Sequence, residues 1–166
     1  SPVNYSRHLL PAAAAAGTPV WADVHAYDGA DDYYDDFLAA ADYLFMSEEA
    51  IGDYREFMRE QVETGTELVV CTHGSDGASA LTAGGEWFEV PAEDFEMADT
   101  NGAGDAFFAG YYYGHRQGLA VETCLRLGTL AGGLAVSSWD LAHPDLSPDR
   151  LAAEYDRRYD EEFQSA

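Results

Sequence analysis

Residues 99–107 read Asp-Thr-Asn-Gly-Ala-Gly-Asp-Ala-Phe, a run of small residues that ends in an acid and leads directly into an apolar, helix-like segment. Gly102 and Gly104 allow backbone conformations that other residues avoid, and they let a ligand approach the main chain closely. The first N–H groups of the following helix have no partner within that helix and lie at the positive end of its dipole. These features predict an anion-binding turn, with the carboxylate of Asp105 at its rim as a general base. Taken alone, a GxGD string is also compatible with a purely structural glycine turn.

The longer string, followed by Phe108-Ala109-Gly110, resembles the signature D-T-x-G-A-G-D-x-F-x-x-G of the ribokinase-like, or PfkB, family of carbohydrate and nucleoside kinases. All fixed positions of that signature match. The resemblance implies that Asp105 is the catalytic base and that the backbone of Gly102, Ala103 and Gly104 forms the anion hole. It also implies ATP and Mg²⁺ as cofactors, with Asn101 among the nucleotide-binding residues and Asp99 among the metal-binding ones.

A second segment, Thr72-x-Gly74-x-x-Gly77, resembles the family's T-x-G-x-x-G segment, which lines the ATP site. The resemblance implies that its residues bind the nucleotide: Thr72, Gly74, Ser75, Asp76 and Gly77. On local rules alone, Ser-Asp-Gly is a good turn, and a turn is the simpler interpretation. His73 lies within this segment, and we interpret it as a surface or turn histidine.

The chain departs from the family after the apolar strand predicted at residues 43–46. The family has an N-x-x-E motif there, whose Asn and Glu help to organise Mg²⁺ and phosphate. Here Ser47 takes the place of the Asn, and Glu49 is our first choice for the metal-organising acid, with Glu48 next. Local rules give Ser47 a different role, as the N-cap of a helix that runs to about Thr64.

Residues 119–139 predict a long buried helix with a face of small residues at Gly128, Ala131, Gly132 and Gly133. Small side chains there allow either close helix packing or close approach of a ligand. By position in the family, Thr129 would stand beside the nucleotide base. The usual Gly-Ala after this helix reads Asp140-Leu141, so activation by a monovalent cation such as K⁺ stays open.

Strands and helices alternate along the chain, which predicts an α/β fold with a mainly parallel sheet flanked by helices. We expect helices at about 6–16 (capped by Ser6, ended by Gly17), 31–41, 47–64, from 107, at 119–139 and from 148. We expect strands at 18–25, 43–46, 66–72, 79–82 and 86–90. The resemblance implies that residues 1–166 form a single domain, the C-terminal portion of a ribokinase-like kinase without the N-terminal half and lid that carry most acceptor contacts.

The net charge of −23, with 31 acidic residues and eight arginines as the only basic ones besides histidine, disfavours nucleic acids and anionic membranes as partners. Adaptation to high salt is one explanation of the acidity; a GC-rich genome would explain only the missing lysines. Cys71 and Cys124 predict buried free thiols in a reducing compartment. Without a signal-peptide pattern or a membrane-length apolar run, we expect a cytoplasmic protein. The family resemblance also suggests a homodimer of the full-length protein.

Three hypotheses follow. The first is ATP-dependent phosphotransfer to a hydroxyl of a sugar or nucleoside, with ribose, fructose, a keto-deoxy sugar acid and a nucleoside as open acceptors. The second is a nucleotide-binding or regulatory module of the same fold that no longer catalyses, which the altered N-x-x-E segment favours. The third is an α/β domain whose glycine turn is only structural.

Overall fold

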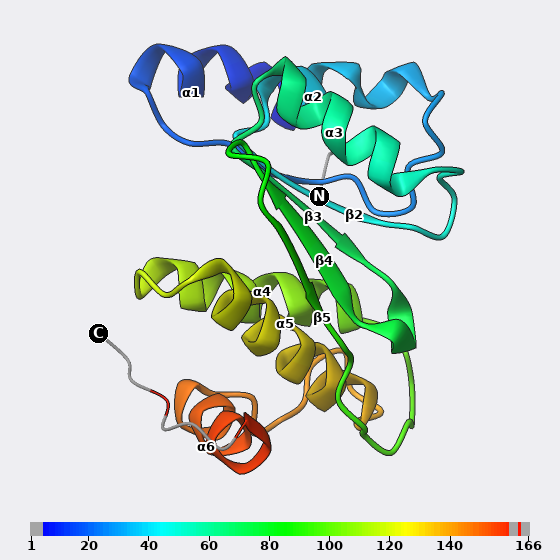
Figure 1. The fold of residues 1–166 in the computed structure, drawn as a ribbon, viewed down its shortest axis with the longest axis vertical. Coiled ribbons are helices and arrows are strands. Elements are labelled where there is room, and N and C mark those ends of the chain that lie inside the picture. The colour runs from blue at the N-terminus through cyan, green and yellow to red at the C-terminus, as the bar shows by residue number, and fades with distance from the viewer. Residues whose placement is uncertain (1–4, 160–162, 164–166) are drawn as a thin grey trace. The chain divides into compact units, whose positions relative to one another are not determined.

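The computed structural model describes residues 5–159 and 163. Its contacts group into two compact units, each described by itself. Unit 1 comprises Ser1–His73 and Ser79–Phe88, and unit 2 comprises Gly74–Ala78 and Glu89–Ala166. In chain order (Figure 1) the elements are η1 (Ser6–Leu9), α1 (Leu10–Ala16), β1 (Trp21–Asp23), η2 (Asp32–Tyr34), α2 (Asp35–Ala40), β2 (Tyr43–Ser47), α3 (Tyr54–Thr64), β3 (Leu68–Thr72), η3 (Gly74–Asp76), β4 (Ala78–Thr82), β5 (Trp87–Val90), α4 (Ala103–Arg116), α5 (Val121–Val136) and α6 (Pro148–Tyr159).

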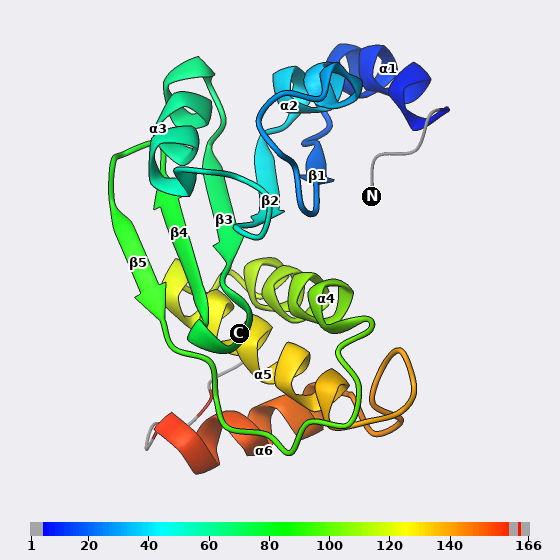
Figure 2. The same ribbon diagram turned by 90° about the vertical axis from the view of Figure 1, so that its right-hand side faces the viewer.

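The five strands form one sheet in the order β1-β2-β3-β4-β5. β1 pairs with β2 and β2 with β3 in parallel, in registers that place Phe45 beside both Asp23 and Val70. β4 runs opposite to β3 and β5 (Figure 2). The sheet is therefore mixed and mostly parallel, as the alternation of strands and helices predicted. Because β1, β2 and β3 are parallel, their carboxyl ends lie along the same edge.

The core of unit 1 is built by one face of the sheet and the helices that cover it. Leu44, Met46 and Val69 project from the strands and pack against Phe57 and Met58 of α3. The thiol of Cys71 belongs to this core and is free, and burial raises its pKa to about 12. The expectation of a buried free thiol is confirmed.

The start of α3 corrects the sequence prediction. The helix begins at Tyr54 and not at Ser47, which instead is the last residue of β2. Asp53 is the N-cap: its side chain accepts a hydrogen bond from the backbone N–H of Glu56 at 3.0 Å. Asp53 with Glu56 three residues later is a stronger start signal than Ser47, since both residues can satisfy backbone donors of the first turn. The Ser47 hydroxyl accepts from the N–H of Glu49 at 3.3 Å in a local turn.

The first helix and first strand are also shorter than expected. Residues 6–9 form a 3₁₀ turn before α1, Ser6 is not a cap, and the N-cap of the turn is Tyr5 without a side-chain hydrogen bond. Pro11 is tolerated because it stands in the first turn of α1. Gly17 ends that helix in a left-handed conformation at φ 61°, as predicted.

Unit 2 is a helical layer whose main pair is α4 and α5, which lie side by side in both views (Figures 1 and 2). Glycines bring the two helices close together. A Cβ added at Gly110 would lie 2.7 Å from the Ala131 methyl carbon, and one added at Gly128 would lie 2.8 Å from the Phe107 ring. The small face of α5 thus serves close helix packing at these positions. The second thiol, Cys124, is buried in α5 and free, and burial raises its pKa to about 11.

The last helix, α6, begins as predicted. The hydroxyl of Ser147 accepts from the N–H of Arg150 at 3.2 Å, and Pro148 is the first helical residue. Leu151 and Tyr155 are buried against α5. No helix among the described residues is both long enough and apolar enough to cross a bilayer.

Glu154 is a buried acid on α6 that pairs with three arginines. Its side chain is 6 % exposed, and its carboxylate lies 2.8 Å from Arg150, 2.6 Å from Arg157 and 3.5 Å from Arg158. Burial raises the pKa of this carboxyl, but the hydrogen bond from Arg157 and the charges of Arg157, Arg158 and Arg150 together hold the pKa below its usual value. The ionised form is therefore the one that stabilises the fold.

Glu154→Gln is expected to lower the free energy of unfolding by about 1.5–3 kcal/mol at pH 7, since charged hydrogen bonds are lost at a buried site. The difference from wild type should shrink as the pH falls below 4.5, the ordinary pKa of this group. Because the folded-state pKa of Glu154 is lowered, the stabilisation is fully present above that pH and is lost as the pH falls through the folded-state pKa. Urea denaturation of wild type and variant, at pH 7 and at a pH below 4.5, measures the difference in the free energy of unfolding. The control is Glu122→Gln, whose partner Arg126 lies 2.6 Å away but whose own side chain is 49 % exposed; an equal loss in both variants would contradict the expectation.

Candidate active site

The turn at residues 99–102 is ordered by Asp99. Its Oδ1 accepts from the backbone N–H of Asn101 at 3.1 Å and from Asn101 Nδ2 at 3.0 Å. The hydrogen bond from the backbone N–H of Asn101, followed by the one from its side chain, lowers the pKa of the Asp99 carboxyl. The backbone N–H groups of Ala98 and Asp99 donate to the carbonyl oxygen of Val136, at 2.7 and 3.2 Å. The turn is thereby fixed to the end of α5.

Gly102 is the N-cap of α4 and adopts a left-handed conformation at φ 79°. A Cβ at this position would overlap the backbone carbonyl of Leu141. The glycine is thus required twice, by its own dihedral angle and by the close approach of another segment. Because glycine has no side chain, the helix begins without a side-chain cap. The first-turn N–H groups have no partner within the helix, and that of Ala103 donates to the carbonyl of Thr100 in the preceding turn at 3.3 Å.

Gly104 and Asp105 are exposed in the first turn of α4. In contrast to Gly102, a Cβ added at Gly104 would meet no atom within 4 Å. Packing within the chain therefore does not require glycine at 104. The structure places the acid and the glycine turn together, as the sequence predicted. Their part in catalysis stays a prediction.

The Gly74–Gly77 loop is a second tight turn of unit 2. Residues 74–76 form a 3₁₀ turn, and Gly77 has φ 110°. A Cβ at Gly77 would overlap the carbonyl oxygen of Val90. Ser75 and Asp76 are exposed. The turn interpretation accounts for the glycines by backbone geometry, and the nucleotide role of the loop stays a prediction.

The carboxyl ends of β1, β2 and β3 meet in unit 1. The N–H of Ser47 donates to the carbonyl of His25 at 2.8 Å, and the N–H of Glu48 donates to the carbonyl of Thr72 at 3.2 Å. The hydroxyl of Thr72 donates to the carbonyl of Met46 at 3.4 Å. Ser47 and Thr72 are thus brought together here, with Glu48 between them and Glu49 exposed beside them.

His73 differs from the surface or turn histidine that the sequence predicted. Its side chain is only 11 % exposed, and both ring nitrogens have polar partners. Nδ1 lies 2.8 Å from Glu48 Oε2, and Nε2 lies 2.7 Å from the hydroxyl of Ser79. The sequence signal was weak, because Glu48 precedes His73 by 25 residues. The only hint was that each of the two lies within two residues of the end of a predicted strand.

Thr129 is buried in α5, where its hydroxyl donates to the carbonyl of Arg126 at 2.8 Å. Within the helix this hydroxyl therefore already has a backbone partner. The predicted position beside a nucleotide base is not supported by any contact of the described side chain and stays a prediction.

The acids at the end of β2 fit Mg²⁺ held in part by a phosphate ligand. Among the residues that the structure describes, no three His, Cys, Asp or Glu side chains group into an all-protein metal site. Mg²⁺ is commonly bound through one or two carboxylates together with substrate phosphates and water. The exposed carboxylate of Glu49 and the partly exposed one of Glu48 are oxygen donors of the right chemistry.

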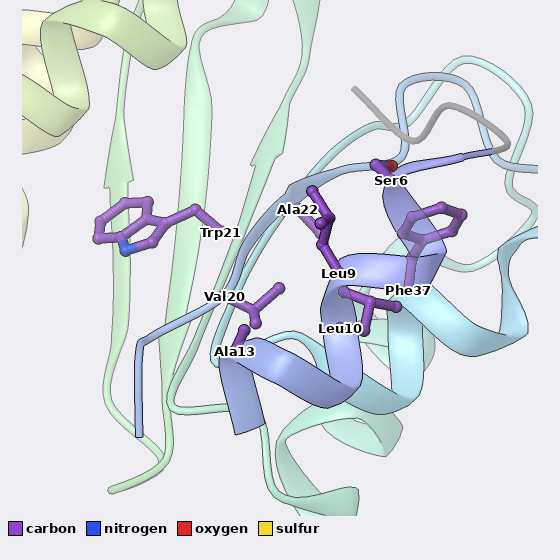
Figure 3. Close-up of a pocket in the computed structure, with 8 residues that line it drawn as sticks. All are labelled: Ser6, Leu9, Leu10, Ala13, Val20, Trp21, Ala22 and Phe37. Atoms are coloured by element: carbon purple, nitrogen blue, oxygen red, sulfur yellow. The ribbon is translucent and has the colours of Figure 1, made fainter. Parts of the chain in front are cut away.

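A hollow of about 290 Å³ lies elsewhere in unit 1, between α1 and β1 (Figure 3). Figure 3 shows the side chains of Ala13 and Val20 directed toward one another there. Ser6 is the only polar side chain among its lining residues, which are Ser6, Leu9, Leu10, Ala13, Val20, Trp21, Ala22 and Phe37. The hollow contains none of the predicted site residues and lacks groups for phosphate chemistry.

Solved kinase structures share this fold. The chain superposes on a microbiome-derived acarbose kinase with a TM-score of 0.81 at 28 % identity, covering 89 % of this chain and 51 % of that one. A putative ribokinase II from E. coli, solved in complex with ATP and Mg²⁺, shares the fold at a TM-score of 0.77 and 20 % identity, covering 90 % of this chain and 52 % of that one. The fold class predicted from the sequence is confirmed.

The chain belongs to the pfkB family of carbohydrate kinases, whose family model matches residues 1–147. A curated relative is the acarbose 7(IV)-phosphotransferase of an Actinoplanes species, 38 % identical over 117 residues, which are 68 % of this chain and 39 % of that protein. The chain thus spans about two fifths of this relative and about half of the two solved structures. The family resemblance drawn from residues 99–110 is confirmed.

Proposed function

We propose that this chain is the nucleotide-binding part of a kinase that transfers the γ-phosphate of ATP to a hydroxyl of a sugar or sugar-like alcohol. The observation that carries the proposal is the turn at 99–105. Gly102 opens α4 without a side-chain cap, and Asp105 stands exposed in the first turn directly behind it. Family membership supports the same assignment.

In the proposed reaction, Asp105 takes the proton of the acceptor hydroxyl while that oxygen forms a bond to the γ-phosphorus. The bond from this phosphorus to the oxygen of the ADP leaving group breaks. The backbone N–H groups of Gly102, Ala103 and Gly104 stabilise the negative charge on the transferred group. Asp99 acts indirectly, because it fixes Asn101 and with it the shape of the turn. Mg²⁺, when bound, would neutralise phosphate charge. In unit 1, Glu49 and Glu48 are candidates to hold it, and in unit 2 Asp99 is a separate candidate besides its part in shaping the turn.

The acceptor is proposed as a carbohydrate, since the family is one of carbohydrate kinases and two of the relatives named above are an acarbose phosphotransferase and an acarbose kinase. The chain spans only part of those proteins, so the individual sugar is left to experiment. The net charge of −23 fits a small-molecule acceptor better than a nucleic acid.

A non-catalytic nucleotide-binding module is the second candidate. It is favoured by one observation, the end of β2, where Ser47 stands in place of the family's Asn and its hydroxyl is engaged in a local turn with Glu49. This alternative predicts nucleotide binding without transfer to any acceptor.

Calorimetric titration with ATP and Mg²⁺, followed by ADP release with a panel of acceptors, tests both candidates. The panel is acarbose, a keto-deoxy sugar acid, ribose, fructose and a nucleoside, each in KCl and in NaCl to reveal monovalent-cation activation. We expect the full-length protein to bind ATP saturably and to release ADP in an acceptor-dependent manner. Binding without release would favour the module, and a folded protein that does not bind ATP would contradict both.

A further inference from the structure

The carboxylate of Glu48 is tied to the interior of unit 1 through two side chains. Ser79 on β4 is 2 % exposed, and its hydroxyl lies 2.7 Å from Nε2 of His73. The His73 side chain is 11 % exposed, and its Nδ1 lies 2.8 Å from Glu48 Oε2. The Glu48 side chain is 38 % exposed. Ser79, His73 and Glu48 therefore form a hydrogen-bonded chain that begins at a buried hydroxyl and ends at a carboxylate accessible to solvent.

The backbone of Glu48 is fixed as well as its side chain. Its N–H donates to the carbonyl of Thr72, and the N–H of the preceding Ser47 donates to the carbonyl of His25. The His73 ring also lies against Tyr54, the first residue of α3, with ring centroids 4.7 Å apart. With its main chain and one carboxylate oxygen held, Glu48 has little freedom to turn away from the strand ends.

We propose that His73 is a positioning residue that holds Glu48 with its second carboxylate oxygen free to serve the Mg²⁺ of the bound nucleotide. This inference rests on the proposed function and deepens it by choosing Glu48 over Glu49 as the ordered acid. A carboxylate has lone pairs for several partners, and His73 occupies only one oxygen. Histidine and carboxylate partners behind a ligand commonly fix its orientation and change metal affinity about 10–100-fold when removed.

The chemistry of the partners fixes the direction of each hydrogen bond in the neutral ring. An ionised carboxylate only accepts, so Nδ1 must carry the proton and donate to Glu48. Nε2 then accepts from the Ser79 hydroxyl. The structure thus assigns the Nδ1–H tautomer to His73, which can be observed without nucleotide.

Long-range ¹H–¹⁵N spectra of the imidazole groups, recorded on nucleotide-free protein at a pH where the ring is neutral, test the contact directly. We expect the Nδ1–H tautomer for His73 in the wild type and a change of its Nδ1 signal in Glu48→Gln. An Nε2–H tautomer, or a His73 signal that does not respond to Glu48→Gln, would overturn the inference. This readout decides the contact even if the protein transfers no phosphate.

Kinetics with two substitutions test the purpose of the contact. Asparagine can place an N–H near the position of Nδ1, whereas glutamine places one near Nε2. We expect His73→Gln to raise the Mg²⁺ concentration needed for half-maximal rate about 10-fold, and His73→Asn to restore most of the wild-type dependence. His8→Gln, an exposed histidine outside the site, is the control.

The outcomes separate the two proposals. A wild type that transfers no phosphate contradicts the proposed function, and the Mg²⁺ role of Glu48 falls with it. A wild type that transfers phosphate while both folded His73 variants keep its Mg²⁺ dependence overturns the positioning role alone. Thermal unfolding of each variant shows whether it is folded.

Discussion

Asp105→Asn is expected to lower turnover by about 10²–10⁴-fold, the range over which a general base contributes. Asparagine has nearly the same shape but cannot accept the hydroxyl proton. Asp105 is exposed in the first turn of α4, so its loss leaves no cavity in the core. ATP affinity should be retained, because the substitution removes a negative charge beside the proposed phosphate site and leaves the backbone N–H groups in place.

Turnover and ATP affinity are to be measured on the same preparation, with ADP release and calorimetry. The matched control is Asp149→Asn, another exposed acid in the first turn of a helix, α6. Both variants lose a favourable acid–dipole interaction of about 0.3–1 kcal/mol, so their stabilities should be similar. A near-normal turnover in Asp105→Asn would exclude it as the base.

Gly104→Val is expected to lower ATP affinity at least about 10-fold and turnover about 10²–10³-fold, the cost of losing an anion-hole donor. A Cβ here meets no protein atom within 4 Å. The added side chain therefore projects into space that the fold leaves open, which in the proposed function is where the phosphate approaches. The melting temperature should stay close to that of the wild type.

Two comparisons make this result specific. Gly52→Val also adds a side chain in open space, and it should leave both affinity and turnover unchanged. Gly102→Ala should instead destabilise the protein, because its Cβ would overlap the Leu141 carbonyl and its φ of 79° is strained for alanine. Normal ATP binding by Gly104→Val would remove the anion hole from the proposal.

Helix ends that are set by neighbouring residues were predicted well from the sequence. Ser147 and Pro148 predicted the start of α6, and Gly17 predicted the end of α1. The start of α3 was wrong because two cap candidates competed, and Asp53 with Glu56 prevailed over Ser47. In each case the residues that set the helix end lie within one turn of it.

Features that depend on distant segments were beyond the sequence. Gly102 faces Leu141, and Gly77 faces Val90, but neither partner carbonyl can be inferred from the glycine itself. The contact of His73 with Glu48 joins the ends of β3 and β2, and it becomes visible only once the register places Ser47 opposite Thr72. The family signature located the turn at 99–105, whereas its supports come from elsewhere in the chain.

The two buried thiols give the molecule a pair of internal reporters of local opening. Cys71 belongs to unit 1 and Cys124 to unit 2, and burial raises the pKa of both. Only an exposed thiolate reacts readily with an alkylating reagent, so each cysteine becomes modified only when its own surroundings open. Their separate alkylation rates therefore read out how often each unit unfolds on its own, and whether a nucleotide slows one, the other or both.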